Sequence, residues 1–397
     1  MDNNCSLDFS IIPRELRLLL EIIRTGKGDI NGQFKNELFT DINWDNFLYL
    51  ARHHRIYPML YSKLKKFDGE LIPIQVIQTL YHEYKKNTYQ MLQLCAEMEQ
   101  VSKLFTEHQI RLLFLKGPVI AADIYGDISL RTSKDLDILI PKTDLKRAEE
   151  LLLNQGYERV EVQATLYEWK WSKHHVSYFH PQKKIELEIH WRLHPAPTKE
   201  PNFNELWQRK RISKLTSYPV YYLGDEDLFL FLVAHGVRHG WFRLRWLLDI
   251  DQMIRNGIIN EKNNGLLKFF QQHYLGRHAL ILSSQLLNTP INEEMQSLTT
   301  GKRTRKQAQM AIFYIIEMGN SFSNEPFSIK LNLHKSFVLN LYQFSIRSNL
   351  QKFFYIIKLF YPSPADTEIL RLPKSLQFLY FPLRPFLWVW RKTMKPI

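Results

Sequence analysis

Two acidic residues alternate with apolar residues in the segment 135–140, which reads Asp-Leu-Asp-Ile-Leu-Ile. Side chains of an extended chain alternate between the two faces of a sheet, so Asp135 and Asp137 point to one face, roughly 7 Å apart along the strand. Leu136 and Ile138 point to the other face. Because neighbouring carboxylates repel each other unless a cation neutralises them, the pattern predicts a strand with one apolar face and one cation-binding face.

A short strand and a glycine turn precede this segment. Residues 112–115 form an apolar run that ends in Lys116 and Gly117, which predicts a buried strand that stops at a turn. Pro118 occupies the position of a first helical residue, and the apolar residues after it predict a short helix that ends at Gly126. A strand, a glycine turn, a helix and an acidic strand are therefore expected in direct succession.

A second alternating segment, residues 185–193, carries Glu186, Glu188 and His190 on one face and apolar residues on the other. We expect it to pair antiparallel with 135–140, which would bring Glu188 or Glu186 beside the aspartates. Paired carboxylates at the edge of a sheet suit Mg²⁺, which takes one or two protein carboxylates and fills its other positions with water and substrate phosphate. The choice between the two glutamates stays open.

In this order the residues resemble the uncharacterised nucleotidyltransferase family of the DNA polymerase β-like superfamily, whose pattern is a strand, a glycine turn and a helix, then two aspartates on the next strand and one carboxylate on a later strand. The likeness rests on Leu115-Lys116-Gly117, Tyr125-Gly126-Asp127, Arg131, Asp135-x-Asp137 and Glu188-Ile189-His190-Trp191, and it extends to residues 50–55, 235–249 and 362–366. It implies an α+β fold, with a small mixed β-sheet nucleotidyltransferase core flanked by helical N-terminal and C-terminal regions.

The resemblance also implies an activity, the Mg²⁺-dependent transfer of a nucleoside monophosphate from a nucleoside triphosphate (NTP) to an acceptor hydroxyl. The expected catalytic and metal-binding residues, which would hold two Mg²⁺ ions, are Asp135, Asp137 and Glu188. The expected nucleotide-binding residues are Lys116, Gly117, Arg131 and Ser133. The acceptor is left open among a small molecule, a peptide, a protein side chain and a tRNA end.

Two positions depart from the family pattern. The usual Gly-Ser is replaced by Lys116-Gly117-Pro118, without the serine, and Glu188 stands where aspartate is commoner. The missing serine supports an alternative function, a catalytically impaired nucleotide-binding or partner-binding subunit of a biosynthetic or regulatory complex. Kinase-like phosphoryl transfer is disfavoured, because neither GxxxxGK[ST] nor GxGxxG occurs.

Apolar residues recur at helical spacing on both sides of this core. The expected helices cover residues 13–26, 43–66, 74–109, 145–154, 225–233, 244–255, 265–287, 305–318, 333–360 and 374–393, and further strands are expected at 157–163 and 174–180. The chain is accordingly divided into a helical region at 1–110, the nucleotidyltransferase-like α+β core at 111–222 and a basic helical region at 223–397.

His235 and His239 lie one helical turn apart, the spacing of a two-histidine metal site. The residues between them lack the glutamate of the HExxH pattern, which argues against a zinc hydrolase. We expect these histidines to pack with Arg238 and Arg245 against the catalytic sheet, where one or more could contact phosphate or base.

The composition of the chain indicates the cellular location and the kind of partner to expect. Two cysteines provide no disulfide framework, the N-terminus does not read as a signal peptide, and no apolar stretch approaches the roughly 20 residues of a membrane span. These features predict a cytoplasmic protein. The net charge is +13, and residues 301–397 hold fifteen lysines and arginines against four acidic residues. This basic C-terminal region predicts contact with a polyanion.

Overall fold

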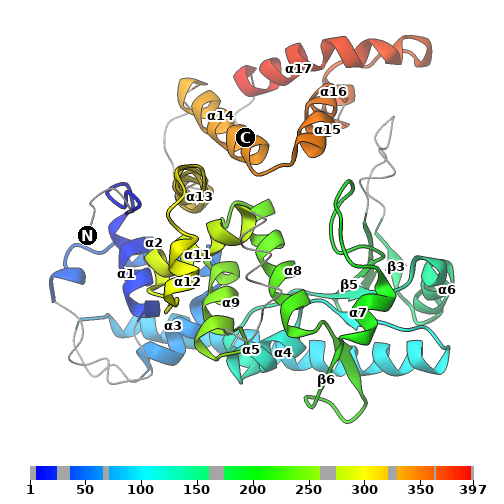
Figure 1. Ribbon diagram of the computed structural model, residues 1–397, viewed down its shortest axis with the longest axis horizontal. Helices are drawn as coiled ribbons and strands as arrows, with labels where there is room; N and C mark the ends of the chain where they lie inside the picture. Colours follow the sequence, from blue (N-terminus) through cyan, green and yellow to red (C-terminus); the bar gives the residue numbers. More distant parts are fainter. Residues whose placement is uncertain are drawn as a thin grey trace.

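The computed structural model describes residues 6–24, 36–65, 71–160, 174–259, 274–320, 329–361 and 364–394. Its N-terminal part is helical, with α1 (Arg14–Arg24), α2 (Trp44–His53), α3 (Tyr57–Leu64) and α4 (Ile74–Glu107). The long helix α4 runs alongside the sheet (Figure 1). Its Asn87 side chain donates to the Ser129 carbonyl, and Ser102 Oγ donates to the Pro219 carbonyl. Helix α4 therefore ties the two sides of the core together.

The core is a mixed sheet of seven strands with the order β3-β4-β5-β2-β1-β7-β6. The strands are β1 (Leu113–Phe114), β2 (Asp135–Leu139), β3 (Glu158–Arg159), β4 (His175–His180), β5 (Ile185–His190), β6 (Arg211–Ser213) and β7 (Val220–Tyr222). The pairs β2/β5 and β1/β7 are parallel, and the other pairs are antiparallel. This confirms the α+β fold with a mixed sheet and helical flanks.

The expected antiparallel pairing of residues 185–193 with 135–140 is wrong, because β5 pairs with β2 in parallel. Strand β4 runs antiparallel to β5, and the two are joined by a tight turn that includes Lys184 at φ 54°. This turn reverses the chain and inserts β5 between β4 and β2, running in the same direction as β2. The side-chain alternation is the same for either direction, so the sequence pattern did not distinguish them.

Helix α5 (Pro118–Tyr125) begins and ends as predicted, and Gly126 follows it in a left-handed conformation at φ 71°. The other elements of the core are η3 (Ile128–Leu130), η4 (Lys142–Asp144), α6 (Leu145–Asn154) and α7 (Phe203–Gln208), and η2 (Asn36–Leu38) precedes α2. The expected helix over 43–66 is divided instead, because Arg55 adopts φ 56° and Pro58 lies in the first turn of α3. Proline lacks the amide hydrogen that an interior helical position needs.

The C-terminal part is again helical. It contains α8 (Asp225–Arg238), α9 (Leu244–Arg255), α11 (Tyr274–Leu287), α12 (Glu293–Ser297), α13 (Lys302–Asn320), α14 (Ile329–Ser345), α15 (Asn349–Leu359), α16 (Pro364–Ile369), η5 (Lys374–Leu379) and α17 (Tyr380–Met394). The expected helix over 333–360 is thus two helices. Residues 161–163 of one expected strand and residues 265–273 of one expected helix lie outside the described residues.

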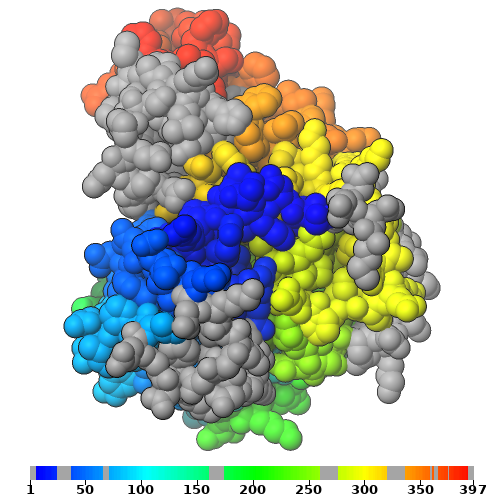
Figure 2. Space-filling model, turned by 90° about the vertical axis from the view of Figure 1, so that its left-hand side faces the viewer, coloured from blue at the N-terminus to red at the C-terminus, as the bar shows by residue number. Residues whose placement is uncertain are grey.

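The two helical regions contact each other as well as the sheet. The Arg24 guanidinium donates to the carbonyls of Leu286 and Gln285, at 2.8 and 3.1 Å. Figure 2 shows the N-terminal helices, in blue, lying directly against the part of the chain that includes α11. Helices α14 to α17 gather at one end of the molecule (Figure 1). Within the described part of the chain, no helix combines the length and apolar character that a membrane crossing requires.

Candidate active site

The parallel register of β2 and β5 places acidic residues side by side. Asp135 lies opposite Glu186, and Asp137 lies opposite Glu188, so all four residues share one face of the sheet. Leu136 and Ile138 of β2, with Leu187 and Ile189 of β5, point to the opposite face and are fully buried. The predicted division into an acidic face and an apolar face is therefore present.

Asp137 is the most enclosed of these carboxylates, with a side chain that is 0 % exposed. Its Oδ1 atom lies 3.1 Å from Lys116 Nζ and 3.1 Å from His190 Nε2. Burial by itself raises the pKa of the Asp137 carboxyl, but the charges and hydrogen bonds of Lys116 and His190 lower it well below its ordinary value. Asp137 Oδ2 is buried and has no hydrogen-bond partner among the described residues. One carboxylate oxygen is thus left to bind a ligand.

Glu188 and His190 complete a group of potential metal ligands with Asp137. His190 Nε2 lies 3.2 Å from Glu188 Oε2, and ligand atoms of Asp137, Glu188 and His190 all lie within 4.8 Å of one another. Two carboxylates and one imidazole at this separation form a donor set for a divalent cation. We call Asp137, Glu188 and His190 the acidic centre.

A second group of donors shares His190. Strand register sets His175 opposite His190, and ligand atoms of His174, His175 and His190 lie within 4.8 Å of one another. His175 Nε2 also lies 4.0 Å from Glu188 Oε2. Burial, together with the charges of neighbouring histidines, lowers the pKa of His174 to about 2, so its ring is neutral and able to bind a metal.

Asp135 and Glu186 form the paired position two residues before Asp137 and Glu188 on the same face. Burial and the charge of Asp137 raise the pKa of the Asp135 carboxyl. Neither residue belongs to a donor group found among the described residues, whereas Glu188 does. Of the two glutamates that the sequence left open, the structure therefore places Glu188 beside Asp137 and Glu186 beside Asp135.

Four basic side chains lie near enough to Asp135 for its charge to act on them, and we call them the basic cluster. They are Arg55, Lys134, Arg243 and Arg245, which come from the α2–α3 junction, the loop before β2 and the start of α9. The Asp135 charge acts on all four. Where the structure is described, no carboxylate forms an ion pair with Arg55, Lys134 or Arg243.

The basic cluster is electrostatically strained. Burial and the charge of Arg243 lower the pKa of Arg55 to about 10. Burial and the charge of Arg131 lower the pKa of Arg245 to about 9. Mutual repulsion of partly buried cations without counterions is relieved by a bound anion. The cluster is therefore suited to phosphate groups.

The glycine turn lies at the Asp135 end of the face. Gly117 precedes α5 with φ 96°, and a Cβ atom there would lie 3.3 Å from Leu136 Cδ2 and 3.9 Å from the Asp135 carbonyl oxygen. A left-handed φ and this close approach both favour glycine. The turn thus brings bare backbone next to Asp135, with Lys116 held beside it by Asp137.

Arg131 and Ser133 lie inside the protein. The Arg131 guanidinium forms a two-point ion pair with Asp249 of α9, at 2.9 and 3.0 Å, and both side chains are 0 % exposed. Ser133 Oγ donates to the Asp135 carbonyl at 3.1 Å. The structure therefore places both predicted nucleotide-binding side chains in contacts that hold the loop before β2.

His235, in α8, and His239, directly after it, pack against Trp246 of α9. Burial, with the charge of Arg238, lowers the pKa of His239 to about 4, and its ring lies against Trp246. Neither histidine belongs to a donor group among the described residues.

The sequence alone does not predict the positions of Arg55, Lys134, Arg243 and the pair His174-His175 beside the acidic face. The helix break signalled by Pro58 points to Arg55, because it places the arginine at a junction rather than on a helical face. His174 and His175 stand directly before an alternating strand whose hairpin returns to His190. Arg243 offers no comparable signal, because it reaches the site only through the packing of α9.

The core is thus a mixed sheet with a strand, a glycine turn and a helix, followed by two aspartates on the next strand and a glutamate on the strand beside it. The sequence model described as "uncharacterised nucleotidyltransferase" matches residues 40–279, more than half of the chain. The protein belongs to this family. No curated protein and no solved structure matches the chain.

Proposed function

We propose that the protein transfers a nucleoside monophosphate from an NTP to an acceptor hydroxyl in a reaction that requires Mg²⁺. The observation that carries this proposal is the position of the acidic centre. Asp137 and Glu188 lie side by side on adjacent strands, near a basic cluster whose Arg55, Lys134 and Arg243 form no ion pair with a described carboxylate. Carboxylates for a cation and cations for a triphosphate are the two requirements of nucleotidyl transfer.

The residues of the acidic centre fit a divalent cation. The buried Oδ2 of Asp137 has no hydrogen-bond partner in the described structure, and Glu188 supplies a second carboxylate within 4.8 Å. Asp135 lies close enough to influence both and would extend the site toward a second ion. Bound Mg²⁺ would neutralise phosphate charge and polarise the acceptor hydroxyl.

The basic cluster would hold the triphosphate. Arg55 and Arg243 carry unpaired guanidinium groups that suit two-point contacts with phosphate oxygens. The bare turn at Gly117 would let phosphate oxygens approach the backbone. These contacts orient the NTP so that its α-phosphorus lies near the acidic centre.

In the proposed reaction, the acceptor oxygen forms a bond to the α-phosphorus while the bond from that phosphorus to the β-phosphate oxygen breaks. Pyrophosphate leaves with the bonding electron pair. The acceptor hydroxyl proton passes to solvent water. Asp137 keeps its charge throughout, because Lys116 and His190 hold the pKa of its carboxyl low.

One contact favours the alternative of a catalytically impaired nucleotide-binding subunit. Lys116 Nζ forms an ion pair with Asp137 Oδ1 at 3.1 Å, so a lysine competes for the carboxylate that should bind the cation. In an active enzyme, Lys116 turns to the triphosphate when NTP binds. In an impaired one, Lys116 stays on Asp137, and NTP binds without pyrophosphate release.

The basic C-terminal region adds a further proposed contact. The charge excess in residues 301–397 supports binding of a polyanion outside the acidic centre. Its strength should fall steeply with salt.

The test uses α-labelled NTP with Mg²⁺ and follows both pyrophosphate release and label transfer. We expect Asp137→Asn to abolish both while the circular dichroism spectrum stays unchanged. Arg55→Met and Arg243→Met should raise the NTP KM about tenfold or more, because each removes a charge-assisted contact. Lys142→Met, at an exposed position outside the site, is the matched control. Full activity in Asp137→Asn would refute the proposal, and NTP binding without release in the wild type would favour the impaired subunit.

A further inference from the structure

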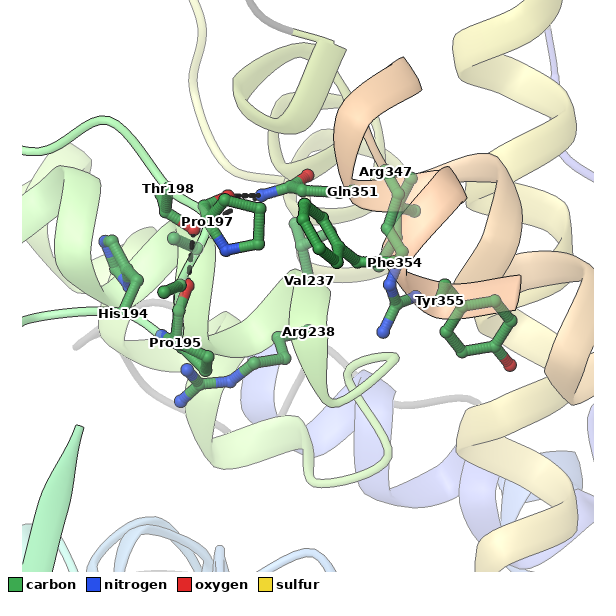
Figure 3. A pocket seen from close by; sticks show the side chains of 13 residues that line it. His194, Pro195, Pro197, Thr198, Val237, Arg238, Arg347, Gln351, Phe354 and Tyr355 are labelled. Atoms are coloured by element: carbon green, nitrogen blue, oxygen red, sulfur yellow. Dashed lines mark hydrogen bonds between the residues drawn. The ribbon is translucent and has the colours of Figure 1, made fainter. Parts of the chain in front are cut away.

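A cavity of about 330 Å³ lies between α8, the start of α15 and the loop 194–198 that follows β5 (Figure 3). Most of its wall is apolar, with Pro195, Pro197, Val237 and Phe354 facing one another. This volume falls at the lower end of the range for small-molecule sites, roughly 300–1,000 Å³. The cavity can therefore enclose a small molecule, but not a folded macromolecule.

Arg238 links the cavity to the acidic centre. Its side chain lines the cavity, and the charges of Asp137 and Glu188 act on its guanidinium. His194, which also lines the cavity, is influenced by both Arg238 and His190. Because loop 194–198 directly follows β5, the cavity lies beyond the His190 end of the acidic face.

The cavity and the basic cluster thus flank the acidic centre from opposite ends. The basic cluster lies near Asp135, the first residue of β2, and the cavity lies beyond His190, the last residue of β5. Since the two strands are parallel and in register, Asp137 and Glu188 lie between them. Nucleotidyl transfer needs the leaving pyrophosphate and the attacking hydroxyl on opposite sides of the α-phosphorus. The end opposite the basic cluster is where an acceptor belongs.

The charge of the residues that line the cavity favours the binding of an anion. The thirteen lining residues include two arginines, Arg238 and Arg347, and no aspartate or glutamate. Arg238 Nη1 is buried without a hydrogen-bond partner among the described residues, while Nη2 lies 3.3 Å from His235 Nδ1. Arg347 is less available, because it contacts Gln343 and stacks 4.2 Å from the centre of the Tyr355 ring. Arg238 therefore offers the free donor.

The walls of the cavity are fixed by hydrogen bonds. Gln351 Nε2 of α15 donates to the Pro197 carbonyl at 3.0 Å and to Thr198 Oγ1 at 3.2 Å (Figure 3). At the other end of the loop, Glu200 accepts from Arg192 and from the backbone amide of His194. The cavity is held open in advance of binding, which lowers the cost of ordering a ligand.

We propose that this cavity binds the acceptor, and that the acceptor is a small hydroxy acid with an apolar body. The carboxylate would contact Arg238, the apolar body would lie between Pro197, Val237 and Phe354, and a hydroxyl next to the carboxylate would face Asp137 and Glu188. This inference rests on the proposed function. The hydroxyl oxygen forms the new bond to the α-phosphorus, its proton passes to solvent water, and the bond to the β-phosphate oxygen breaks as pyrophosphate departs.

A matched set of probes separates the three features of the acceptor. The set consists of 3-phenyllactate, 3-phenyllactamide without the charge, 3-phenylpropionate without the hydroxyl, and lactate without the apolar body. Calorimetry on the full chain with Mg²⁺ and a non-hydrolysable NTP analogue measures binding. We expect phenyllactate and phenylpropionate to bind, and the amide and lactate to bind at least about tenfold more weakly. Only phenyllactate should stimulate pyrophosphate release.

Variants test the location. Arg238→Gln should weaken phenylpropionate binding about tenfold or more, and Ala234→Phe should fill the cavity and remove binding. Both should bind the NTP analogue like the wild type, which also shows that they are folded. If Ala234→Phe does not fold, Phe354→Ala removes an opposite wall and should weaken binding. Lys142→Met is the unchanged control.

The outcomes separate this inference from the proposed function. Probe binding that the cavity variants abolish, without label transfer to phenyllactate, supports the cavity and counts against the transferase. Transfer to a tRNA end or a protein that is indifferent to Arg238→Gln and Ala234→Phe supports the transferase and overturns the cavity assignment. Failure of every carboxylate probe to bind, or equal binding of the amide, also overturns it.

Discussion

The buried ion pair between Arg131 and Asp249 gives the sharpest prediction about stability. Asp249 receives two hydrogen bonds from Arg131 and a third from the Tyr125 hydroxyl at 2.8 Å, and the ion-paired side chains are 0 % exposed. Asp249→Leu would leave a buried guanidinium without a counterion. Removing one partner of such a pair lowers the free energy of unfolding by about 3–5 kcal/mol. Arg131→Met should cost a similar amount.

The chain contains a matched control. Arg209 and Asp227 form an ion pair of the same two-point geometry, at 2.8 and 2.9 Å, but the Arg209 side chain is 50 % exposed. Solvent screens the Arg209 charge, but Asp227 is only 8 % exposed, so Arg209→Met should lower the free energy of unfolding by only about 1–2 kcal/mol. Urea denaturation of the full chain, followed by tryptophan fluorescence, compares the two pairs under the same conditions.

The double variant Arg131→Met/Asp249→Leu should recover most of the lost stability, because no buried charge is left unpaired. It also tests whether Arg131 binds NTP itself or only holds the loop before β2. If Arg131 only holds the loop before β2, the double variant binds NTP with near wild-type affinity. An Asp249→Leu cost no larger than that of Arg209→Met would refute the reasoning about burial.

Two further predictions concern single positions. Gly117→Ala should weaken NTP binding and lower stability by about 1–2 kcal/mol, since it forces a Cβ against Leu136 at a left-handed φ; calorimetry with an NTP analogue checks this, and wild-type affinity would contradict it. Burial lowers the pKa of His278 to about 3, so below pH 6.5 the unfolded state takes up a proton that the folded state does not. Stability should then fall by up to about 1.4 kcal/mol per pH unit. His278→Leu should show a shallower loss of melting temperature from pH 6.5 to 4.5, and an unchanged slope would count against this assignment.

Features that depend on local pattern could be predicted from the sequence. Alternation in residues 135–140 and 185–193 placed Asp137 and Glu188 on one face, whichever way the strands run. Pro118 and Gly126 gave the bounds of α5, because proline favours the first helical position and glycine favours the left-handed position after the last turn. The direction of β5 was missed, since it depends on the hairpin with β4 rather than on any pattern within the strand.

Features that depend on distant packing could not be predicted. Arg55 and Arg243 stand far apart in the sequence and meet only because α3 and α9 pack around the same loop. Arg131 matched a family position, but its burial against Asp249 requires knowledge of where α9 lies. The cavity likewise joins the loop after β5 to α15, about 150 residues later in the chain. A single residue has no periodic pattern from which such a contact could be predicted.

The central claim is that Asp137 and Glu188 together bind a divalent cation in the presence of NTP. Mn²⁺ accepts the same carboxylate oxygens as Mg²⁺ and is paramagnetic, so its binding can be titrated by electron paramagnetic resonance with a non-hydrolysable NTP analogue. We expect Asp137→Asn and Glu188→Gln each to weaken Mn²⁺ binding about tenfold or more. Glu186→Gln, two residues before Glu188 on the same face of β5, should change the Mn²⁺ affinity by less than about twofold. Undiminished Mn²⁺ binding by Asp137→Asn, or equal losses for Glu186→Gln and Glu188→Gln, would contradict the account.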